Sequence, residues 1–289
     1  MRPVASFTSS FRPAYWLTLV PALAACFGAQ TAVLRLTGGR TTKSESNFFS
    51  SVARLQSGIR GTPRVMLLGS SITGRLPDRN RGFEGVGNLG CDGGSAAEVL
   101  RAMDRGTIPH APQLIVEGNT LYRAVGAGET ELAAAIGKHW FRTGVEVPNL
   151  SAAGRPSSVA YTLLMERRMG TAGAGSSDVL ATTSRPAPVS GAAAPVSDAE
   201  NALLEELTGI LRRLSAAGTE VLIVMLPPGA KAGTPNRVLP EELARRAGLP
   251  FWDLAAAIPP DAVRFTDGVH MDPPSAAAAL RTLLDATGD

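Results

Sequence analysis

Cysteine and histidine are scarce in this chain, and both shortages limit the kinds of functional site that it can form. Only two cysteines, Cys26 and Cys91, occur among 289 residues, and they lie in very different sequence contexts. Such a pair implies neither a disulfide framework nor a CxxC-type metal site. The three histidines stand at positions 110, 139 and 270. Any catalytic step that needs an imidazole therefore has only three candidates.

The chain also lacks a strong net charge and a basic stripe with interleaved aromatic residues. Lys and Arg outnumber Asp and Glu by 28 to 25, and aromatic residues make up 5% of the sequence. Nucleic acid is therefore not an expected partner. With 44% hydrophobic and 18% charged residues, the composition is that of a folded protein with a sizeable core.

One segment near the N-terminus has no charge at all. Arg2 and Arg12 precede an uncharged stretch from Pro13 to Leu34, close to the roughly 20 residues that cross a bilayer as a helix. A secretory h-region is shorter, about 7–15 residues. Positive charge before the stretch favours a cytoplasmic N-terminus. We therefore expect residues 1–36 to be a membrane anchor or signal segment, with the remainder outside the cytoplasm in the cell envelope.

A cleaved signal is the alternative to an uncleaved anchor. Leu23-Ala24-Ala25-Cys26 is similar to the lipobox of bacterial lipoproteins, which are acylated at the cysteine. Apolar sequence continues to Leu34, whereas mature lipoproteins usually turn polar soon after the cysteine, so the pattern favours the anchor over a lipoprotein. A buried core helix is the third interpretation, and it alone would leave the domain unexported.

Beyond this segment, short apolar runs alternate with helical patterns. We expect buried strands at Val65–Leu68, Gln113–Val116, Val221–Leu226 and Phe251–Leu254, and a weaker one at Gly85–Leu89. Helical apolar spacing occurs at 46–56, 95–103, 129–141, 157–168, 198–216, 241–247 and 275–286. The alternation predicts a three-layer α/β/α domain around a central parallel sheet.

These patterns divide the chain into the anchor or signal segment, a juxtamembrane linker and helix at 37–62, and a main domain at 63–289. Within the main domain, residues 170–196 consist almost entirely of Gly, Ala, Ser, Thr and Pro, with only Asp178 and Arg185 charged. Such a stretch buries little apolar surface and is long for a connection in a compact domain. We expect a flexible insertion here, and a substrate lid is the second interpretation.

The first expected strand ends abruptly in Gly69-Ser70-Ser71. A phosphate loop would need a lysine after its second glycine, but Arg75 follows Gly74, and the middle glycine of a dinucleotide fingerprint is missing. An ordinary turn is one interpretation. The other is a serine displayed at the carboxyl edge of a parallel sheet, where ligands bind in open α/β folds. Such a serine is inert until a base takes its proton.

His270 is the candidate base. Asp267-Gly268-Val269-His270 places a carboxylate and an imidazole on one short loop, and a carboxylate that orients the ring is the third member of a triad. Taken alone, a DxxH pattern is more often structural. His110 lies in a proline-flanked loop and His139 in a helical pattern, so structural or surface roles suit them better.

Four segments, in order, resemble the first, second, third and fifth functional blocks of the SGNH (GDSL-like) hydrolase family. They are Gly69–Thr73, Asn88–Ser95, Gly118-Asn119 and Asp267–His270, and the resemblance spans about residues 63–289. It implies a flavodoxin-like fold, with Ser71 as the nucleophile and Asp267 and His270 completing the triad. It also implies that the Ser71 and Gly93 N–H groups and the Asn119 side chain bind the oxyanion.

Two positions depart from the family pattern. Ser70 stands where the family usually has an aspartate, and Thr120 stands where an aspartate often follows the asparagine. Neither change removes a triad or oxyanion residue. The GSS variant resembles membrane-tethered members of bacterial envelopes that move or remove acyl groups on polymers.

The resemblance and the expected export together imply a serine esterase that removes O-acyl groups, acetyl among them, from an envelope glycan or exopolysaccharide, with no metal or organic cofactor. Its expected partners are the acylated carbohydrate and, through the N-terminal helix, the inner membrane. One alternative is an O-acyltransferase that works with a membrane acyl donor or polysaccharide-export partner. Others are a non-catalytic scaffold or carbohydrate-binding module of an export complex, and a nonspecific lipase.

Overall fold

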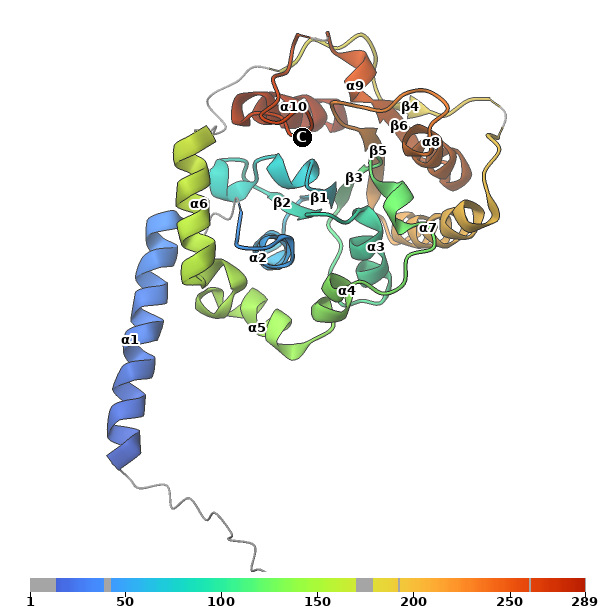
Figure 1. The fold of residues 1–289 in the computed structure, drawn as a ribbon. Coiled ribbons are helices and arrows are strands. Elements are labelled where there is room, and N and C mark those ends of the chain that lie inside the picture. The colour runs from blue at the N-terminus through green and yellow to red at the C-terminus, as the bar shows by residue number, and fades with distance from the viewer. Residues whose placement is uncertain (1–13, 39–42, 170–178, 192, 260, 289) are drawn as a thin grey trace, which may run out of the picture.

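The computed structural model describes residues 14–38, 43–169, 179–191, 193–259 and 261–288 (Figure 1). The chain is α/β, with one mixed sheet in the order β2-β1-β3-β5-β6-β4. The parallel strands are β1 (Val65–Ser70), β2 (Val86–Cys91), β3 (Gln113–Glu117), β5 (Glu220–Met225) and β6 (Pro250–Asp253). The two-residue strand β4 (Ala187–Pro188) pairs antiparallel with β6 at one edge. All five strands expected from the sequence are confirmed.

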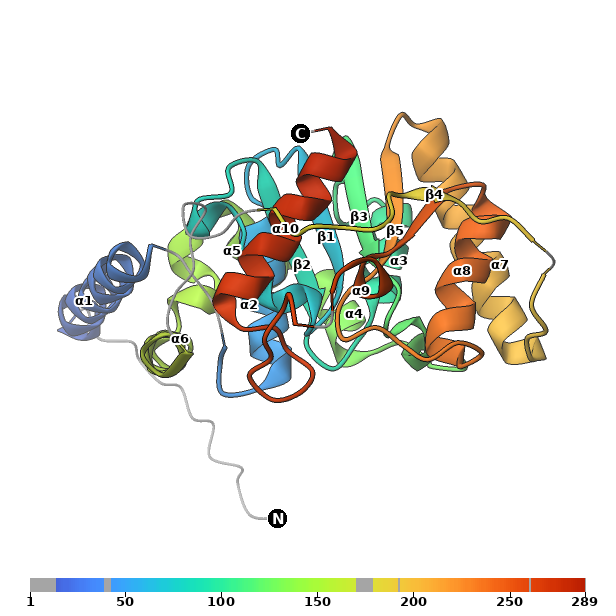
Figure 2. The same cartoon turned by 90° about the horizontal axis from the view of Figure 1, so that it is seen from above.

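The central strands are apolar because helices cover both faces of the sheet. On one face, Met66 and Leu68 of β1 join a core cluster with α2 (Asn47–Ile59), α3 (Ala96–Asp104), α7 (Asp198–Ala216) and α8 (Pro235–Ala247). On the other face, Val65 and Leu67 pack in a second cluster with α9 (Leu254–Ala257) and α10 (Pro273–Thr287). Figure 2, seen from above, shows α10 lying across β1 and β2.

Short elements connect these layers. The remaining helices are α4 (Glu131–Ile136), α5 (His139–Glu146) and α6 (Pro156–Met169). Single 3-10 turns are η1 (Thr73–Arg75), η2 (Arg79–Arg81), η3 (Leu121–Ala124), η4 (Pro148–Leu150) and η5 (Ala152–Gly154).

Two helix predictions were wrong in their bounds. The single helix expected at 129–141 is two helices, because α4 ends at Ile136, with Gly137 as its C-cap, and Lys138 adopts extended backbone before α5. Apolar periodicity continues across the break and hides it. α8 begins at Pro235 rather than at 241, with Thr234 as its N-cap and Pro235 in the first turn, where proline is tolerated. Pro240 lies inside this helix, and a proline there normally signals a boundary.

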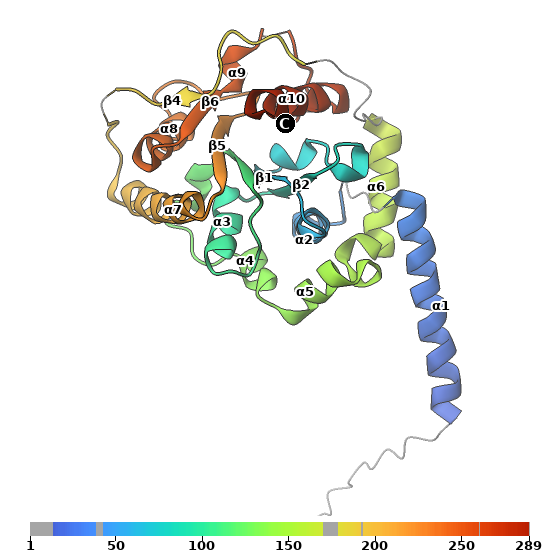
Figure 3. The ribbon, with the colours of Figure 1, turned by 180° about the vertical axis from the view of Figure 1, so that it is seen from behind.

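The N-terminal helix α1 (Ala14–Thr37) projects from the domain (Figures 1 and 3). From Tyr15 to Thr37 it is long and apolar enough to cross a membrane, judged by length and composition. Its last turns pack on the domain, where Asn149 Nδ2 donates to Thr31 Oγ1 at 2.6 Å. The next helix, α2, lies within the domain core, with Val52 and Leu55 fully buried. The folded domain therefore includes α2, which the sequence division had placed with the juxtamembrane segment.

The expected insertion is only partly covered, because residues 170–178 and 192 lie outside the described residues. The described part, 179–191, runs along the sheet edge. Thr183 N–H donates to the Ala257 carbonyl at 2.7 Å, and Leu180 N–H donates to Thr282 Oγ1 at 2.8 Å. Together with the β4–β6 pairing, these bonds attach this part of the segment to β6, α9 and α10.

Candidate active site

Ser71 stands one residue beyond β1, at the carboxyl edge of the sheet. The preceding Gly69 is required by space: a Cβ there would lie 2.2 Å from Thr73 Oγ1 and 2.5 Å from Glu117 Oε2. Ser71 Oγ lies 2.9 Å from His270 Nε2, although the two residues are far apart in sequence. The hydroxyl is therefore in hydrogen-bond contact with a base that can take its proton.

The loop before α10 holds Asp267 against the same histidine. Asp267 Oδ2 lies 2.7 Å from His270 Nδ1, while Oδ1 accepts the backbone N–H groups of Val269 at 3.1 Å and His270 at 2.8 Å. One carboxylate oxygen thus shapes the turn and the other orients the ring. With Nδ1–H donating to Asp267, Nε2 is left as the acceptor that faces Ser71, the tautomer that a general base needs.

Burial alone would raise the pKa of Asp267, but the His270 ring and the Val269 and His270 amides donate to its carboxylate and lower the pKa from 3.8 to about 2. Because the folded-state pKa is depressed, this group stabilises the fold above about pH 4 and ceases to do so as the pH falls toward 2.

The Asp267→Asn variant is therefore expected to be less stable than the parent at pH 7, by under about 1 kcal/mol because the carboxylate is half exposed. The deficit should shrink between pH 4 and pH 2. Urea unfolding of both proteins at each pH measures it. A deficit that stays constant over this range would show that the carboxylate charge contributes nothing.

Two backbone amides near Ser71 have no acceptor among the described residues: those of Ser71 itself and of Gly93. Gly93 follows β2 and has a φ of +82°, which favours glycine. Amides in this state are available to a developing oxyanion, as the sequence prediction requires.

Asn119 is differently engaged from what the sequence suggested. Asn119 is buried and lies two residues after the end of β3. Its side chain pairs with the backbone of Leu226. Asn119 Nδ2 donates to the Leu226 carbonyl at 2.8 Å, and Leu226 N–H donates to Oδ1 at 2.9 Å. The second hydrogen on Nδ2 has no acceptor among the described residues and is the one that could reach an oxyanion.

The structure thus brings Ser71, His270 and Asp267 into one chain of hydrogen bonds. No family model, curated protein or solved structure matches this chain. Within the described residues, no group of three or more His, Cys, Asp or Glu side chains is placed to hold a metal ion. The other two histidines lie elsewhere: His110 precedes β3 at the opposite sheet edge and contacts Thr219 Oγ1 at 2.7 Å, and His139 begins α5.

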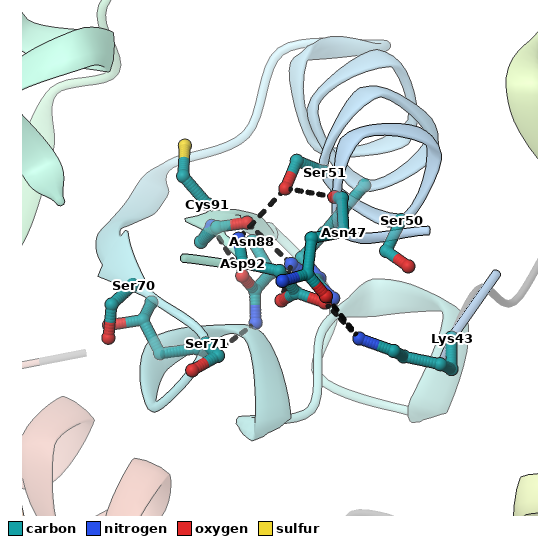
Figure 4. Close-up of polar contacts among 12 residues, drawn as sticks. Lys43, Asn47, Ser50, Ser51, Ser70, Ser71, Asn88, Cys91 and Asp92 are labelled. Carbon is teal, nitrogen blue, oxygen red and sulfur yellow. Dashed lines mark hydrogen bonds and ion pairs between the residues drawn. The ribbon is translucent and has the colours of Figure 1, made fainter. Parts of the chain in front are cut away.

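An ion-pair network that sequence reasoning missed fixes the Gly93 turn from the side of α2 (Figure 4). Asp92 is almost completely buried and lies 3.0 Å from Arg54 Nη1 and 3.2 Å from Lys43 Nζ. Its N–H donates to Ser51 Oγ at 2.8 Å, and Arg54 also donates to the Gly90 carbonyl at 2.5 Å. Burial would raise the pKa of Asp92, but the two cations outweigh it and lower the pKa.

Glu117 is the second residue that the sequence did not single out. Its buried carboxylate accepts from Ser70 N–H at 2.7 Å, from the Ser70 hydroxyl at 2.9 Å, from the Thr73 hydroxyl at 2.9 Å and from the Thr120 hydroxyl at 3.1 Å. Ser70 and Thr120 are the two positions where the chain departs from the SGNH pattern. An acid at either position would face Glu117 as a like charge, whereas a hydroxyl donates to it.

Asn88, at the start of the second block, also supports the turn that carries Ser71. Its Nδ2 donates to the carbonyls of Thr73 and Leu76, each at 2.8 Å, and its Oδ1 accepts Gly90 N–H at 2.9 Å. This side chain ties η1, which follows Ser71, to β2 (Figure 4). The turn that carries Ser71 is therefore held from β2 by Asn88 and from β3 by Glu117.

Proposed function

We propose that this chain is a serine esterase of the SGNH type, with a three-layer α/β/α domain that hydrolyses O-acyl esters. The observation that carries the proposal is the hydrogen-bond chain from Ser71 Oγ through His270 to Asp267, with distances of 2.9 and 2.7 Å. The match of four sequence blocks to one sheet edge supports it.

In the proposed mechanism, Ser71 Oγ attacks the acyl carbonyl while His270 Nε2 takes the serine proton. The protonated ring then gives that proton to the departing alcohol, which leaves an acyl-enzyme on Ser71. Water repeats the sequence and releases the carboxylic acid. Asp267 stabilises the imidazolium, and the Ser71 and Gly93 amides with Asn119 Nδ2 stabilise the tetrahedral oxyanion.

We further propose that α1 anchors the domain outside the cytoplasm. An envelope location makes O-acylated, above all O-acetylated, glycans the substrate class. Transfer of the acyl group to a sugar hydroxyl is the second candidate, because the His270 and Asp267 side chains remain 18% and 54% exposed. A site open on that side admits a carbohydrate acceptor as well as water. A scaffold role would give no reason for the aligned triad.

The test is a fluorophosphonate reaction with the full chain in detergent micelles, followed by intact mass and peptide mapping. Ser71 Oγ should displace fluoride from phosphorus and carry a single adduct, whereas the adjacent Ser70, fully buried against Glu117, should carry none. Labelling should slow strongly in His270→Ala and stay unchanged in His139→Ala. Absence of a Ser71 adduct on folded protein would reject both the esterase and the transferase.

A further inference from the structure

Large apolar side chains that remain exposed are not spread evenly over the domain. Outside α1, six of them gather in residues 139–169: Trp140, Val147, Leu150, Tyr161, Leu163 and Leu164. They come from α5, from residues 147–150 around η4, and from α6. Both η4 and α6 also contact α1, and α6 lies beside the end of α1 in Figures 1 and 3. Exposed apolar residues concentrated in one region mark a surface that binds a protein partner or a membrane.

In its middle turns, α6 is apolar on the outside and polar on the inside. Ser158 and Thr162 face the domain and are almost completely buried, while Leu163 and Leu164 are exposed. Ser158 Oγ contacts Ser44 Oγ at 2.7 Å, and Thr162 Oγ1 donates to the Lys43 carbonyl at 3.3 Å. This is the reverse of a helix whose outer face meets water.

The length of α1 indicates that a lipid bilayer covers this surface. Residues 15–29 are exposed throughout, and from Gln30 onward the helix is partly covered by the domain. At 1.5 Å per residue the exposed part is about 22 Å long, shorter than the roughly 30 Å hydrocarbon core of a bilayer. If α1 crosses the membrane, the bilayer must therefore reach the turns that contact η4 and α6.

The charges in the same region fit a lipid surface. Residues 138–169 contain five Lys or Arg and only two Glu, and Arg167 and Arg168 are exposed at the end of α6. Basic residues beside exposed Trp, Tyr and Leu are the pattern of segments that lie in the headgroup region of anionic bilayers.

We propose that α5, η4 and α6 form a membrane collar that lies in the headgroup region of the bilayer around α1. The proposal rests on the proposed membrane anchoring of α1 and goes beyond it, since it makes the lipid surface a second binding partner of the domain. The collar holds the catalytic domain against the membrane rather than leaving it on a free stalk.

The test uses the full chain in phosphatidylethanolamine–phosphatidylglycerol vesicles, with a fluorophore on one cysteine at a time. Native Cys26 reports on α1, and Cys91 is buried and does not label. In a Cys26→Ser background, Leu164→Cys reports on the collar, and Tyr161→Cys repeats the measurement about one turn away on the same helix. Ala202→Cys is the control, exposed on α7 at the opposite side of the domain. Quenching lipids carry a nitroxide either near the headgroup or deep in the acyl chain.

We expect the deep nitroxide to quench the Cys26 label, the shallow nitroxide to quench the labels at 161 and 164, and neither to quench the label at 202. Collar labels as unquenched as the control, with Cys26 quenched, would overturn the collar and leave the anchor standing. An unquenched Cys26 would overturn both. A third outcome would overturn the lipid as the binding partner. The collar labels would stay unquenched in vesicles, but in native membranes the collar cysteines would be shielded from an impermeant maleimide. The partner covering the collar would then be a membrane protein.

Discussion

Replacing Ser71 with alanine is expected to lower the turnover of an activated acetyl ester, such as p-nitrophenyl acetate, by about 10⁴- to 10⁶-fold. The loss is large because, in the proposed mechanism, the serine oxygen forms the covalent bond, and among the described residues no other hydroxyl contacts the His270 ring. His270→Ala should lose a similar factor. Since the two residues act as one unit, the double variant should be no slower than either single variant.

Stability measurements keep this result interpretable. The Ser71 side chain is partly exposed, and its hydroxyl contacts only His270 among the described residues, so the melting temperature should stay within about 2 °C of the parent. His110→Ala and His139→Ala are the matched histidine controls and should retain full activity. A Ser71→Ala protein that is folded and still turns over at a tenth of the parental rate would exclude the proposed nucleophile.

Replacing Asp92 with alanine is expected to lower the free energy of unfolding by about 3–5 kcal/mol. The variant leaves the guanidinium of Arg54, only 4% exposed, without its carboxylate partner. It should also slow fluorophosphonate labelling of Ser71, because the same carboxylate holds the turn that carries Gly93. Urea unfolding and labelling rates measure the two effects on one sample.

Lys43→Ala is the matched control, since Lys43 contacts the same carboxylate but is 27% exposed. Its cost should stay near or below about 1 kcal/mol. A double variant, Arg54→Met with Asp92→Ala, should be less destabilised than the sum of the single changes, because it removes the unpaired charge. Additive costs would mean that the ion pair does not account for the loss.

The sheet and the Asp267–His270 pair could be predicted from the sequence because both depend on local patterns. Buried parallel strands are continuous apolar runs, so β1 and β5 are visible without any tertiary information. Asp267 and His270 are three residues apart, and the turn that joins them is closed by the aspartate itself. The remaining step, from Ser71 to His270, depends on the resemblance of four segments to the SGNH blocks, because His270 lies in the loop before α10 and follows no strand.

The supports of the site could not be predicted, because they depend on burial and on partners distant in sequence. Glu117 ends an apolar strand, and nothing in the sequence shows that Ser70 and Thr120 donate to it. Arg54 lies in a helix that reads as an ordinary amphipathic segment, and its pairing with Asp92 needs the three-dimensional packing of α2 on β2. A buried carboxylate or guanidinium becomes recognisable only when its partners are known.

The pairing of β4 with β6 has a consequence for how the protein behaves at high concentration. Without it, β6 would present a row of open N–H and C=O groups, a template on which a strand from a second molecule could add. The strand that covers this edge contains Pro188 and follows Pro186, and neither proline has an N–H to offer. A segment of low sequence complexity thus terminates the sheet and limits edge-to-edge aggregation.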